Sequence, residues 1–252
     1  MTGVQQQASA IPPSDLEITL TNKTVRRAQH RPRFEDPLLL LPRGLTKLYS
    51  IWISLTYPFA SKGSNLTFHL TSQLSRQRSV RISLGNSISL KKDAWLNVAT
   101  EDPTGEPVIV IDDNCSIGYG SIVSAKNRIH LERDVLVGQN VLIVDHNHRY
   151  EDTTLPIVKQ GITDGGRIRI GQGSWIGRGA AIVCSRGQLT IGRNCVIAVN
   201  TVVTRSIPDY SLVWGNPATI IRQYDPETRA WRIGPTKKRT ARSQAASVPT
   251  GK

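Results

Sequence analysis

Two histidines lie two residues apart in the tetrapeptide Asp145-His146-Asn147-His148. A neutral imidazole can take a proton from a hydroxyl or an amine, so one of them could be the general base of a transfer reaction. The same pair could instead bind a metal ion, with His130 or Asp145 completing the ligand set. A third interpretation is that these are ordinary polar residues on a loop. The residue types alone leave all three interpretations open.

The three cysteines indicate neither a disulfide framework nor a redox pair. Cys115, Cys184 and Cys195 contain no CxxC spacing, and their number is odd. Two of them, Cys115 and Cys195, fall on interior positions of the repeat described next, where cysteine behaves as a small apolar residue. We therefore expect buried thiols in a reducing compartment.

An apolar residue recurs at every sixth position between residues 109 and 207. A period of six matches neither an α-helix nor a half-buried strand, but it matches one short strand plus one turn. Three such units close a triangular coil, and stacked coils bury a continuous apolar column. A small or β-branched residue four positions after most of the large ones would turn each corner. The aligned triplets are Ile111, Ile117 and Val123; Leu131, Val137 and Ile143; Ile170, Ile176 and Ile182; and Ile191, Ile197 and Val203.

The repeat divides the chain into segments. Residues 79–207 form the predicted coil domain, and the loop 148–167 is its largest interruption. Long loops on regular scaffolds often carry function. Residues 208–235 are expected to cap the stack.

The N-terminal third differs in composition from the repeat. Residues 1–35 are rich in Gln, Ser, Thr, Pro and Arg and predict a disordered arm. Residues 36–78 predict a helical and extended segment. Within it, Leu45, Leu48, Trp52 and Leu55 suit a helix that buries one apolar face.

The chain is strongly basic, with a formal net charge of +13 and a pI near 10.1. Much of the excess lies at the two ends, and residues 236–252 predict a disordered basic tail. Basic tails attract polyanions weakly, but no aromatic residues are interleaved with these, so we do not expect nucleic-acid binding. The polar residues 1–10 lack the apolar core of a signal peptide. We expect a cytoplasmic protein, at most peripherally associated with the inner face of the membrane.

Together these features resemble the hexapeptide-repeat acyltransferases, specifically the bacterial sugar O-acetyltransferases that include the maltose, galactoside and exopolysaccharide-modifying enzymes. The resemblance covers about residues 79–222. Single hexads are weak signals, whereas the combination is specific. The motifs besides the hexads are Asn147-His148-Arg149-Tyr150, Ile170-Gly171-Gln172-Gly173-Ser174-Trp175-Ile176-Gly177, Val202-Val203-Thr204-Arg205-Ser206-Ile207-Pro208 and Gly215-Asn216-Pro217-Ala218.

The resemblance implies an all-β fold, a left-handed parallel β-helix with a short N-terminal helical segment and flexible basic tails. Periodicity alone would not have fixed that hand. It also implies a homotrimer, acetyl-CoA as co-substrate in a cleft between coils, no metal, and a sugar or glycan acceptor. The family's base lies five residues after the inward aliphatic residue of the coil before the loop. Counting from Ile143, this makes His148 the predicted base and His146 the second choice.

The same resemblance suggests which residues contact the substrates. The predicted CoA-binding residues are Trp175, Gly177, Arg178, Thr204, Arg205, Asn216, Pro217 and Arg222. The predicted acceptor-binding residues are Tyr119, Lys126, Asp145 and Asn147. For Trp175 an interface role, for the arginines a solvated surface role and for Asn216-Pro217 a simple turn are the alternatives.

This chain departs from the maltose-type pattern, because the family's acceptor-binding Asn and Asp fall near residues 118–120 and Lys126 here. The acid that supports the base is not identified, and Glu151, Asp152 and Asp164 are candidates. The leading prediction is O-acetylation of a surface or exported polysaccharide or its precursor. N-acylation of an amino-sugar nucleotide is the first alternative. A zinc enzyme of the carbonic-anhydrase type is less favoured, because His146 and His148 are too close in sequence for its ligand spacing.

Overall fold

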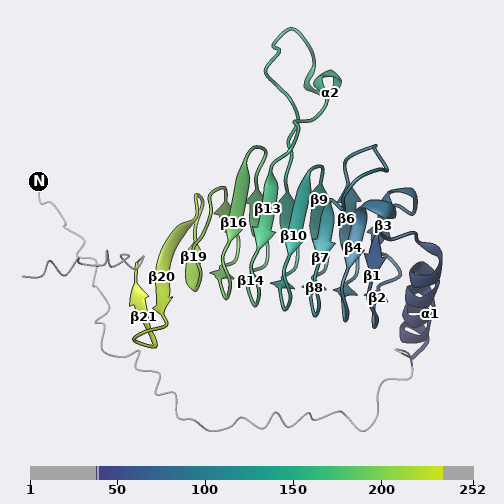
Figure 1. The fold of residues 1–252 in the computed structure, drawn as a ribbon, viewed down its shortest axis with the longest axis horizontal. Helices are drawn as coiled ribbons and strands as arrows, with labels where there is room; N and C mark the ends of the chain where they lie inside the picture. The colour runs from purple at the N-terminus through teal and green to yellow at the C-terminus, as the bar shows by residue number, and fades with distance from the viewer. Residues whose placement is uncertain (1–37, 39, 235–252) are drawn as a thin grey trace, which may run out of the picture. The chain divides into compact units, whose positions relative to one another are not determined.

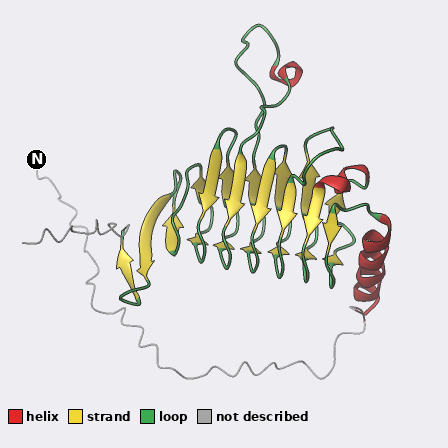
Figure 2. Cartoon of the chain, in the orientation of Figure 1, coloured by secondary structure: helices red, strands yellow, loops and turns green. Residues whose placement is uncertain are grey.

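The structure, a computed structural model, describes residue 38 and residues 40–234. The predicted disordered arm (1–35) and basic tail (236–252) lie outside these residues. The described chain begins with helix α1 (Leu40–Thr56), continues as a stack of triangular coils, and ends in an antiparallel ribbon (Figure 1). Strands dominate and helices are few (Figure 2).

Three sheets form the walls of the stack, and consecutive strands in the chain belong to different sheets. Sheet A contains β1 (Ser61–Lys62), β4 (Ile82–Leu84), β7 (Ile109–Ile111), β10 (Arg128–Leu131), β13 (Arg167–Ile170) and β16 (Gln188–Ile191). Sheet B contains β2 (Thr67–Phe68), β5 (Ser89–Leu90), β8 (Ser116–Ile117), β11 (Leu136–Val137), β14 (Trp175–Ile176), β17 (Val196–Ile197), β19 (Ser211–Trp214), β20 (Thr219–Asp225) and β21 (Ala230–Ile233). Sheet C contains β3 (Gln73–Leu74), β6 (Trp95–Val98), β9 (Ile122–Ala125), β12 (Leu142–Val144), β15 (Ala181–Val183) and β18 (Val202–Val203).

Every coil strand pairs in parallel with the equivalent strand of the next coil. Ile109, Ile129 and Ile168 are register partners in sheet A, as are Leu136 and Trp175 in sheet B. The fold is the predicted left-handed parallel β-helix. It begins earlier than predicted, because β1, β2 and β3 already form a coil between residues 61 and 74, ahead of the expected start at residue 79.

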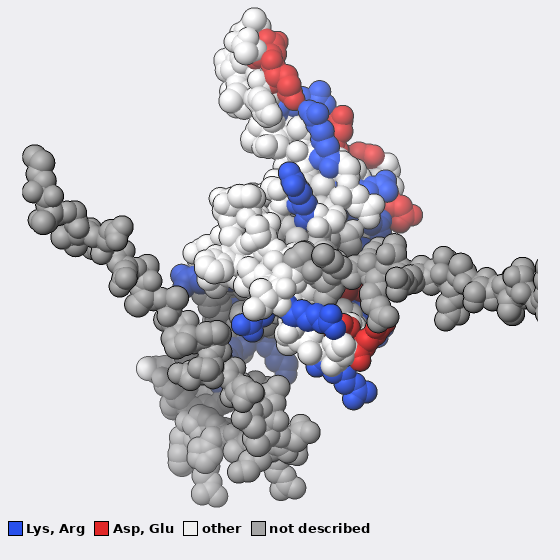
Figure 3. All heavy atoms as spheres, turned by 90° about the vertical axis from the view of Figure 1, so that its left-hand side faces the viewer, with Lys and Arg blue, Asp and Glu red and all other residues white. Residues whose placement is uncertain are grey.

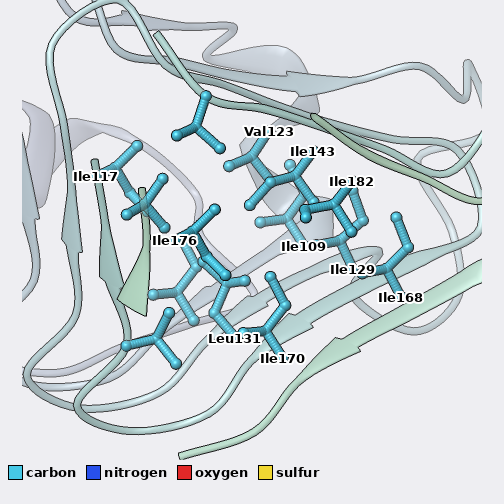
Figure 4. Close-up of a cluster of buried hydrophobic side chains, with 14 of the residues drawn as sticks. Ile109, Ile117, Val123, Ile129, Leu131, Ile143, Ile168, Ile170, Ile176 and Ile182 are labelled. Atoms are coloured by element: carbon cyan, nitrogen blue, oxygen red, sulfur yellow. The ribbon is translucent and has the colours of Figure 1, made fainter. Parts of the chain in front are cut away.

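The core is the column of inward side chains that the six-residue period predicts. All twelve residues of the four triplets are at most 1 % exposed. Figure 4 shows Ile117, Ile176, Val123, Ile143 and Ile182 converging from different walls. Burial of each such aliphatic side chain stabilises the fold by about 1.5–3 kcal/mol.

The small inward residues turn the corners and satisfy backbone groups of the next coil. The hydroxyl of Ser121 donates to the carbonyl oxygen of Gly138 and accepts the N–H of Val141. Burial raises the pKa of the Cys115 thiol to about 12 and that of Cys195 to about 11, so both are buried, protonated side chains in this structure.

The three corners of the coil differ in what they carry. At the corner between sheets B and C, left-handed backbone alternates between glycine and asparagine, as at Gly120 and Asn140. A Cβ on Gly120 would lie 2.6 Å from the side-chain oxygen of Asn140, so a larger residue there would require the Asn140 side chain to move. The corner between sheets C and A instead holds the long connections, including residues 99–108 and 145–166 (Figure 1).

Helix α1 lies against β2, the edge strand of sheet B, but not with the predicted face. The Ser50 hydroxyl accepts the N–H of Phe68 at 2.9 Å and donates to the carbonyl oxygen of Phe68 at 3.2 Å. Ser50 and Ile53 are the buried residues of the helix. The four residues predicted to be buried, Leu45, Leu48, Trp52 and Leu55, are all exposed, because the edge strand selects the face that can satisfy its backbone groups.

At the other end, β19 continues sheet B in parallel with β17, and β20 and β21 then run antiparallel. Within residues 38 and 40–234, no helix combines the length and apolar character needed to cross a bilayer.

Candidate active site

Asp145 and His146 follow directly after β12, where the chain leaves the coil at the C/A corner. The Asp145 side chain is 0 % exposed, and its two carboxylate oxygens accept the backbone N–H groups of Lys126, Asn127 and Arg128 at 2.7–2.9 Å. The Nδ1 atom of His146 lies 3.0 Å from Asp145 Oδ1. Since the ionised carboxylate only accepts, this bond places a proton on Nδ1 and leaves Nε2 of a neutral ring able to accept one.

The acid that contacts His146 is Asp145. The three candidates predicted to support His148 have other partners among the described residues. Glu151 contacts Arg186, Asp152 accepts from Thr154, and Asp164 pairs with Arg149. Backbone N–H groups of Glu151 and Tyr150 lower the pKa of the Glu151 carboxyl, and the Thr154 hydroxyl and N–H lower that of Asp152. All three acids thus have polar partners within the loop or its neighbouring corner.

Strand alternation could have revealed Asp145. Ile143 points inward and is buried, Val144 points outward, and Asp145 returns to the interior. A carboxylate at an inward position needs internal donors, and the backbone turn of residues 126–128 supplies them.

His148 and Asn147 lie farther along the loop and are exposed. The N–H of His148 bonds to the side-chain oxygen of its neighbour Asn147, and His148 forms an antiparallel bridge with Ile162. Among the described residues, no hydrogen-bond partner orients the His148 ring. The two histidines therefore differ in how firmly their rings are held. The side chain of His146 is 12 % exposed and contacts a carboxylate, whereas His148 is exposed on the loop.

The stem of the loop is held closed by hydrogen bonds between its two arms. The N–H of Asn147 donates to the Thr163 hydroxyl, and the N–H of Thr163 donates to the Asn147 carbonyl oxygen. Lys126, predicted to bind the acceptor, donates through Nζ to the Thr163 carbonyl oxygen at 2.7 Å. Beyond this stem, the loop projects far from the coils and carries the short helix α2 (Ile157–Gln160) (Figure 1).

A second group of predicted residues lies at the B/C corner, on a different edge of the stack. Gly177 and Arg178 follow β14, Tyr119 follows β8, and Asn216-Pro217, joined by a cis peptide bond, follows β19. Arg178 lines a groove of about 520 Å³ together with Asn140, Gly179, Val199 and Asn200. The backbone around Gly177 is packed closely, since a Cβ there would lie 2.7 Å from the carbonyl oxygen of Ile197.

The remaining predicted residues occupy other surfaces. Trp175 is half exposed on the outer face of sheet B, between Leu136 and Val196. Thr204 and Arg205 follow β18 at the C/A corner, two coils beyond His146, and Arg222 lies on β20. A single chain therefore has His146, His148, Asp145 and Lys126 at the C/A corner and Arg178 at the B/C corner.

Other polar pairs show how a structural histidine looks in this fold. His130 on β10 places Nε2 3.0 Å from Asp112 Oδ2, on the partly exposed outer face of sheet A. In the part of the chain that the structure describes, no cluster of three or more His, Cys, Asp or Glu side chains could hold a metal ion.

No family model matches the chain. A probable acetyltransferase of Mycobacterium tuberculosis, Rv3034c, is 33 % identical over 130 residues, which are 51 % of this chain and 42 % of that protein. The chain thus spans less than half the length of this relative. The putative lipopolysaccharide biosynthesis O-acetyl transferase WbbJ of Escherichia coli is 30 % identical over 136 residues, 52 % of this chain and 68 % of that protein.

Among solved structures, the N-acyltransferase AntD of Bacillus cereus has the same fold. One of its structures, in complex with dTDP-4-amino-4,6-dideoxyglucose and coenzyme A, is 16 % identical with a TM-score of 0.57 and covers 71 % of this chain and 91 % of its own. The coil stack and the sequence identity to an O-acetyl transferase, over two thirds of that relative, indicate the same family. The chain belongs to the hexapeptide-repeat sugar acetyltransferase family.

Proposed function

We propose that this protein transfers an acetyl group from acetyl-CoA to a hydroxyl of a sugar, with His146 as general base. The observation that carries the proposal is the 3.0 Å contact between Asp145 Oδ1 and His146 Nδ1 at the foot of the projecting loop. A carboxylate that fixes the tautomer and the ring direction is the usual partner of a histidine base. The position predicted from the family, His148, has no such partner among the described residues.

In this mechanism the acceptor hydroxyl attacks the thioester carbon directly. His146 Nε2 takes the hydroxyl proton as the new C–O bond forms, and backbone N–H groups stabilise the tetrahedral oxyanion. Collapse of the intermediate breaks the C–S bond, and the proton passes from His146 to the departing CoA thiolate. The products are the acetylated sugar and CoA, and no covalent enzyme intermediate forms.

We assign Asp145 to positioning rather than to acceptor binding, because its side chain has no exposed surface and its oxygens already accept four donors. Lys126 likewise belongs to the loop stem in this proposal, since its ammonium group bonds to the Thr163 carbonyl oxygen. Asn147 and Tyr119 remain candidates for acceptor contacts, and both are exposed.

We further propose a homotrimer in which each site is shared by two subunits. His146 lies at the C/A corner and Arg178 lies at the B/C corner of the same stack, so a neighbouring subunit would supply the second group. The loop supports this arrangement because Leu155, Ile157 and Val158 expose apolar side chains near its tip. Arg178 and Arg205 are the proposed contacts of the CoA phosphates.

The acceptor we propose is a sugar of a surface or exported polysaccharide or of its precursor, in the cytoplasm. The name of the Escherichia coli relative, a lipopolysaccharide biosynthesis O-acetyl transferase, supports that class. The name of AntD, an N-acyltransferase, favours an amino-sugar acceptor as the second candidate. CoA or 3-hydroxybutyryl-CoA is present in the AntD complexes, which supports an acyl-CoA donor here.

A thiol-release assay tests the proposal. Purified protein is supplied with acetyl-CoA and a panel of sugars, amino sugars, nucleotide sugars and oligosaccharides. The variants His146→Ala and His148→Ala are compared with His130→Ala, which removes a histidine from an equally short pair on sheet A. We expect His146→Ala to lower kcat by about 10²–10⁴-fold, the usual contribution of a general base.

The outcomes separate the hypotheses. Loss of turnover in His148→Ala with normal turnover in His146→Ala would assign the base to His148. Release of CoA only with amino sugars would replace O-acetylation by N-acetylation. Absence of both turnover and acetyl-CoA binding would reject the acyltransferase assignment.

A further inference from the structure

The outer face of α1 carries a continuous stripe of large apolar side chains. Each member of the stripe is between 45 % and 76 % exposed. The spacing alternates between three and four residues, which places all of them on one side of a helix. The members are Leu41, Leu45, Leu48, Trp52 and Leu55.

Most of the stripe faces away from the coil stack, and Leu55 at its end also lines the groove between α1 and sheet B. Ser50 and Ile53 are buried on the opposite side of α1, where the helix covers the edge strand β2. Figure 1 shows α1 at the end of the stack, running across the coil axis rather than along it. The apolar stripe is therefore the terminal surface of the described chain at this end.

The same end of the protein carries an excess of basic residues. Between residues 37 and 92 the sequence contains eight Lys and Arg residues and no Asp or Glu. A groove of about 1050 Å³ between α1 and sheet B is lined by Arg43, Lys47, Lys91 and Lys92, and none of its lining residues is acidic. The ammonium groups of Lys47, Lys91 and Lys92 make no ion pair or hydrogen bond with any residue that the structure describes.

The opposite end of the stack has a different charge pattern. Figure 3 views the molecule from that end, and there acidic and basic side chains lie side by side. The ion pairs Arg193–Asp209 and Arg232–Asp225 are part of that surface region. The excess positive charge of the described chain is thus concentrated where the apolar stripe is.

We infer that the α1 end of the protein docks on the surface of an anionic phospholipid bilayer. An apolar stripe with an interfacial tryptophan suits shallow insertion between lipid headgroups, and adjacent lysines suit the headgroup phosphates. A second copy of α1 fits the stripe less well, because the helix contains no acid to pair with Arg43 or Lys47, so two copies would bring like charges together. Docking does not depend on the proposed acyl transfer.

Vesicle sedimentation of the full chain tests this inference. Phosphatidylcholine vesicles with and without phosphatidylglycerol are compared, at low and at high salt. We expect binding to the anionic vesicles that falls with salt. Leu48→Glu should weaken it by at least about tenfold, because a charge replaces an inserting side chain. Lys91→Gln/Lys92→Gln should weaken binding to the anionic vesicles by about tenfold.

Two matched controls lie at other places in the chain. Ile233→Glu places the same charge on an exposed aliphatic residue of β21, and Lys159→Gln/Arg229→Gln removes the same net charge away from α1. Both should bind vesicles like the unaltered protein. Thiol release without vesicles should be unchanged in Leu48→Glu, which separates a failure of docking from a failure of the proposed enzyme activity.

Three results would overturn the inference. Leu48→Glu could bind anionic vesicles as tightly as the unaltered chain, or the Lys91→Gln/Lys92→Gln and Lys159→Gln/Arg229→Gln variants could weaken binding equally. The third is a lower molar mass of Leu48→Glu by light scattering, which would show that a second copy covers the stripe.

Discussion

The carboxylate of Asp145 accepts hydrogen bonds from three consecutive backbone N–H groups and from His146, with no part of its side chain exposed. One residue therefore fixes both the turn at residues 126–128 and the direction of an imidazole. A buried carboxylate without these donors would cost free energy, so the hydrogen bonds of Asp145 stabilise the fold. The same carboxylate also orients His146 in the candidate active site.

Asp145→Asn tests that dual role. The amide keeps one acceptor oxygen and presents an NH₂ group to backbone donors, so we expect the free energy of unfolding to fall by about 2–4 kcal/mol. Under conditions where the variant is folded, kcat should fall by about 100-fold while the KM for acetyl-CoA stays nearly constant. Urea unfolding and steady-state kinetics measure the two effects.

Asp112→Asn is the matched control, because Asp112 pairs with His130 on a partly exposed surface. It should change the free energy of unfolding by less than about 1 kcal/mol. Equal losses of stability in both variants would mean that the buried hydrogen bonds of Asp145 contribute no more to the free energy of unfolding than an exposed pair does.

At the scale of one element, the corner between sheets B and C is closely packed against the next coil. A Cβ on Gly118 would collide with the carbonyl group of Gly138 in the next coil, and it would lie 2.9 Å from the nitrogen of Gln139. The neighbouring atoms are backbone, which cannot move without shifting the register of the whole coil.

We therefore expect Gly118→Ala to lower the free energy of unfolding by about 1–3 kcal/mol, the typical cost of overpacking. Gly44→Ala in α1 is the control, since no atom lies within 4 Å of the added methyl group. That variant should be stabilised by up to about 1 kcal/mol through helix propensity. Thermal unfolding of both variants checks the prediction, and a Gly118→Ala protein of normal stability would contradict the described packing.

For the whole molecule, the decisive feature is that His146 and Arg178 lie at different corners of one stack. If two subunits share each site, a chain with His146→Ala and a chain with Arg178→Ala are each inactive but complement one another. In randomly mixed trimers about a quarter of the sites would contain both wild-type groups, because neighbouring subunits contribute one group each.

Co-expression of the two variants with different tags, followed by purification through both tags, provides the mixed oligomers. We expect thiol release at about a quarter of the unaltered rate, enriched somewhat by the double selection. Mixed oligomers as inactive as either parent would place both groups in one subunit's site or remove Arg178 from it. Light scattering of the same samples measures whether the assembly is a trimer.

The hexad pattern was sufficient to predict the coil stack and its core, because a period of six fixes the direction of each side chain locally and identical turns repeat that choice. Ile143, Ile176 and Cys195 are buried as predicted for this reason. The pattern also identified the loop at residues 148–167 as the main interruption. The predicted start of the coil domain at residue 79 was too late, because the short strands β1 to β3 carry too few apolar residues to show the repeat.

Only the tertiary structure decided which groups meet across coils. Asp145 holds His146 because the turn at residues 126–128 belongs to the coil stacked beneath it, and no sequence spacing encodes that contact. Likewise, the amphipathic pattern of α1 predicted a helix correctly but the wrong buried face. The open edge of β2 needed hydrogen-bond partners, Ser50 could provide them, and the leucine stripe was left on the surface. The repeat period and the residue types determine which way each side chain points from its own strand or helix. The backbone groups of neighbouring elements determine what that side chain contacts.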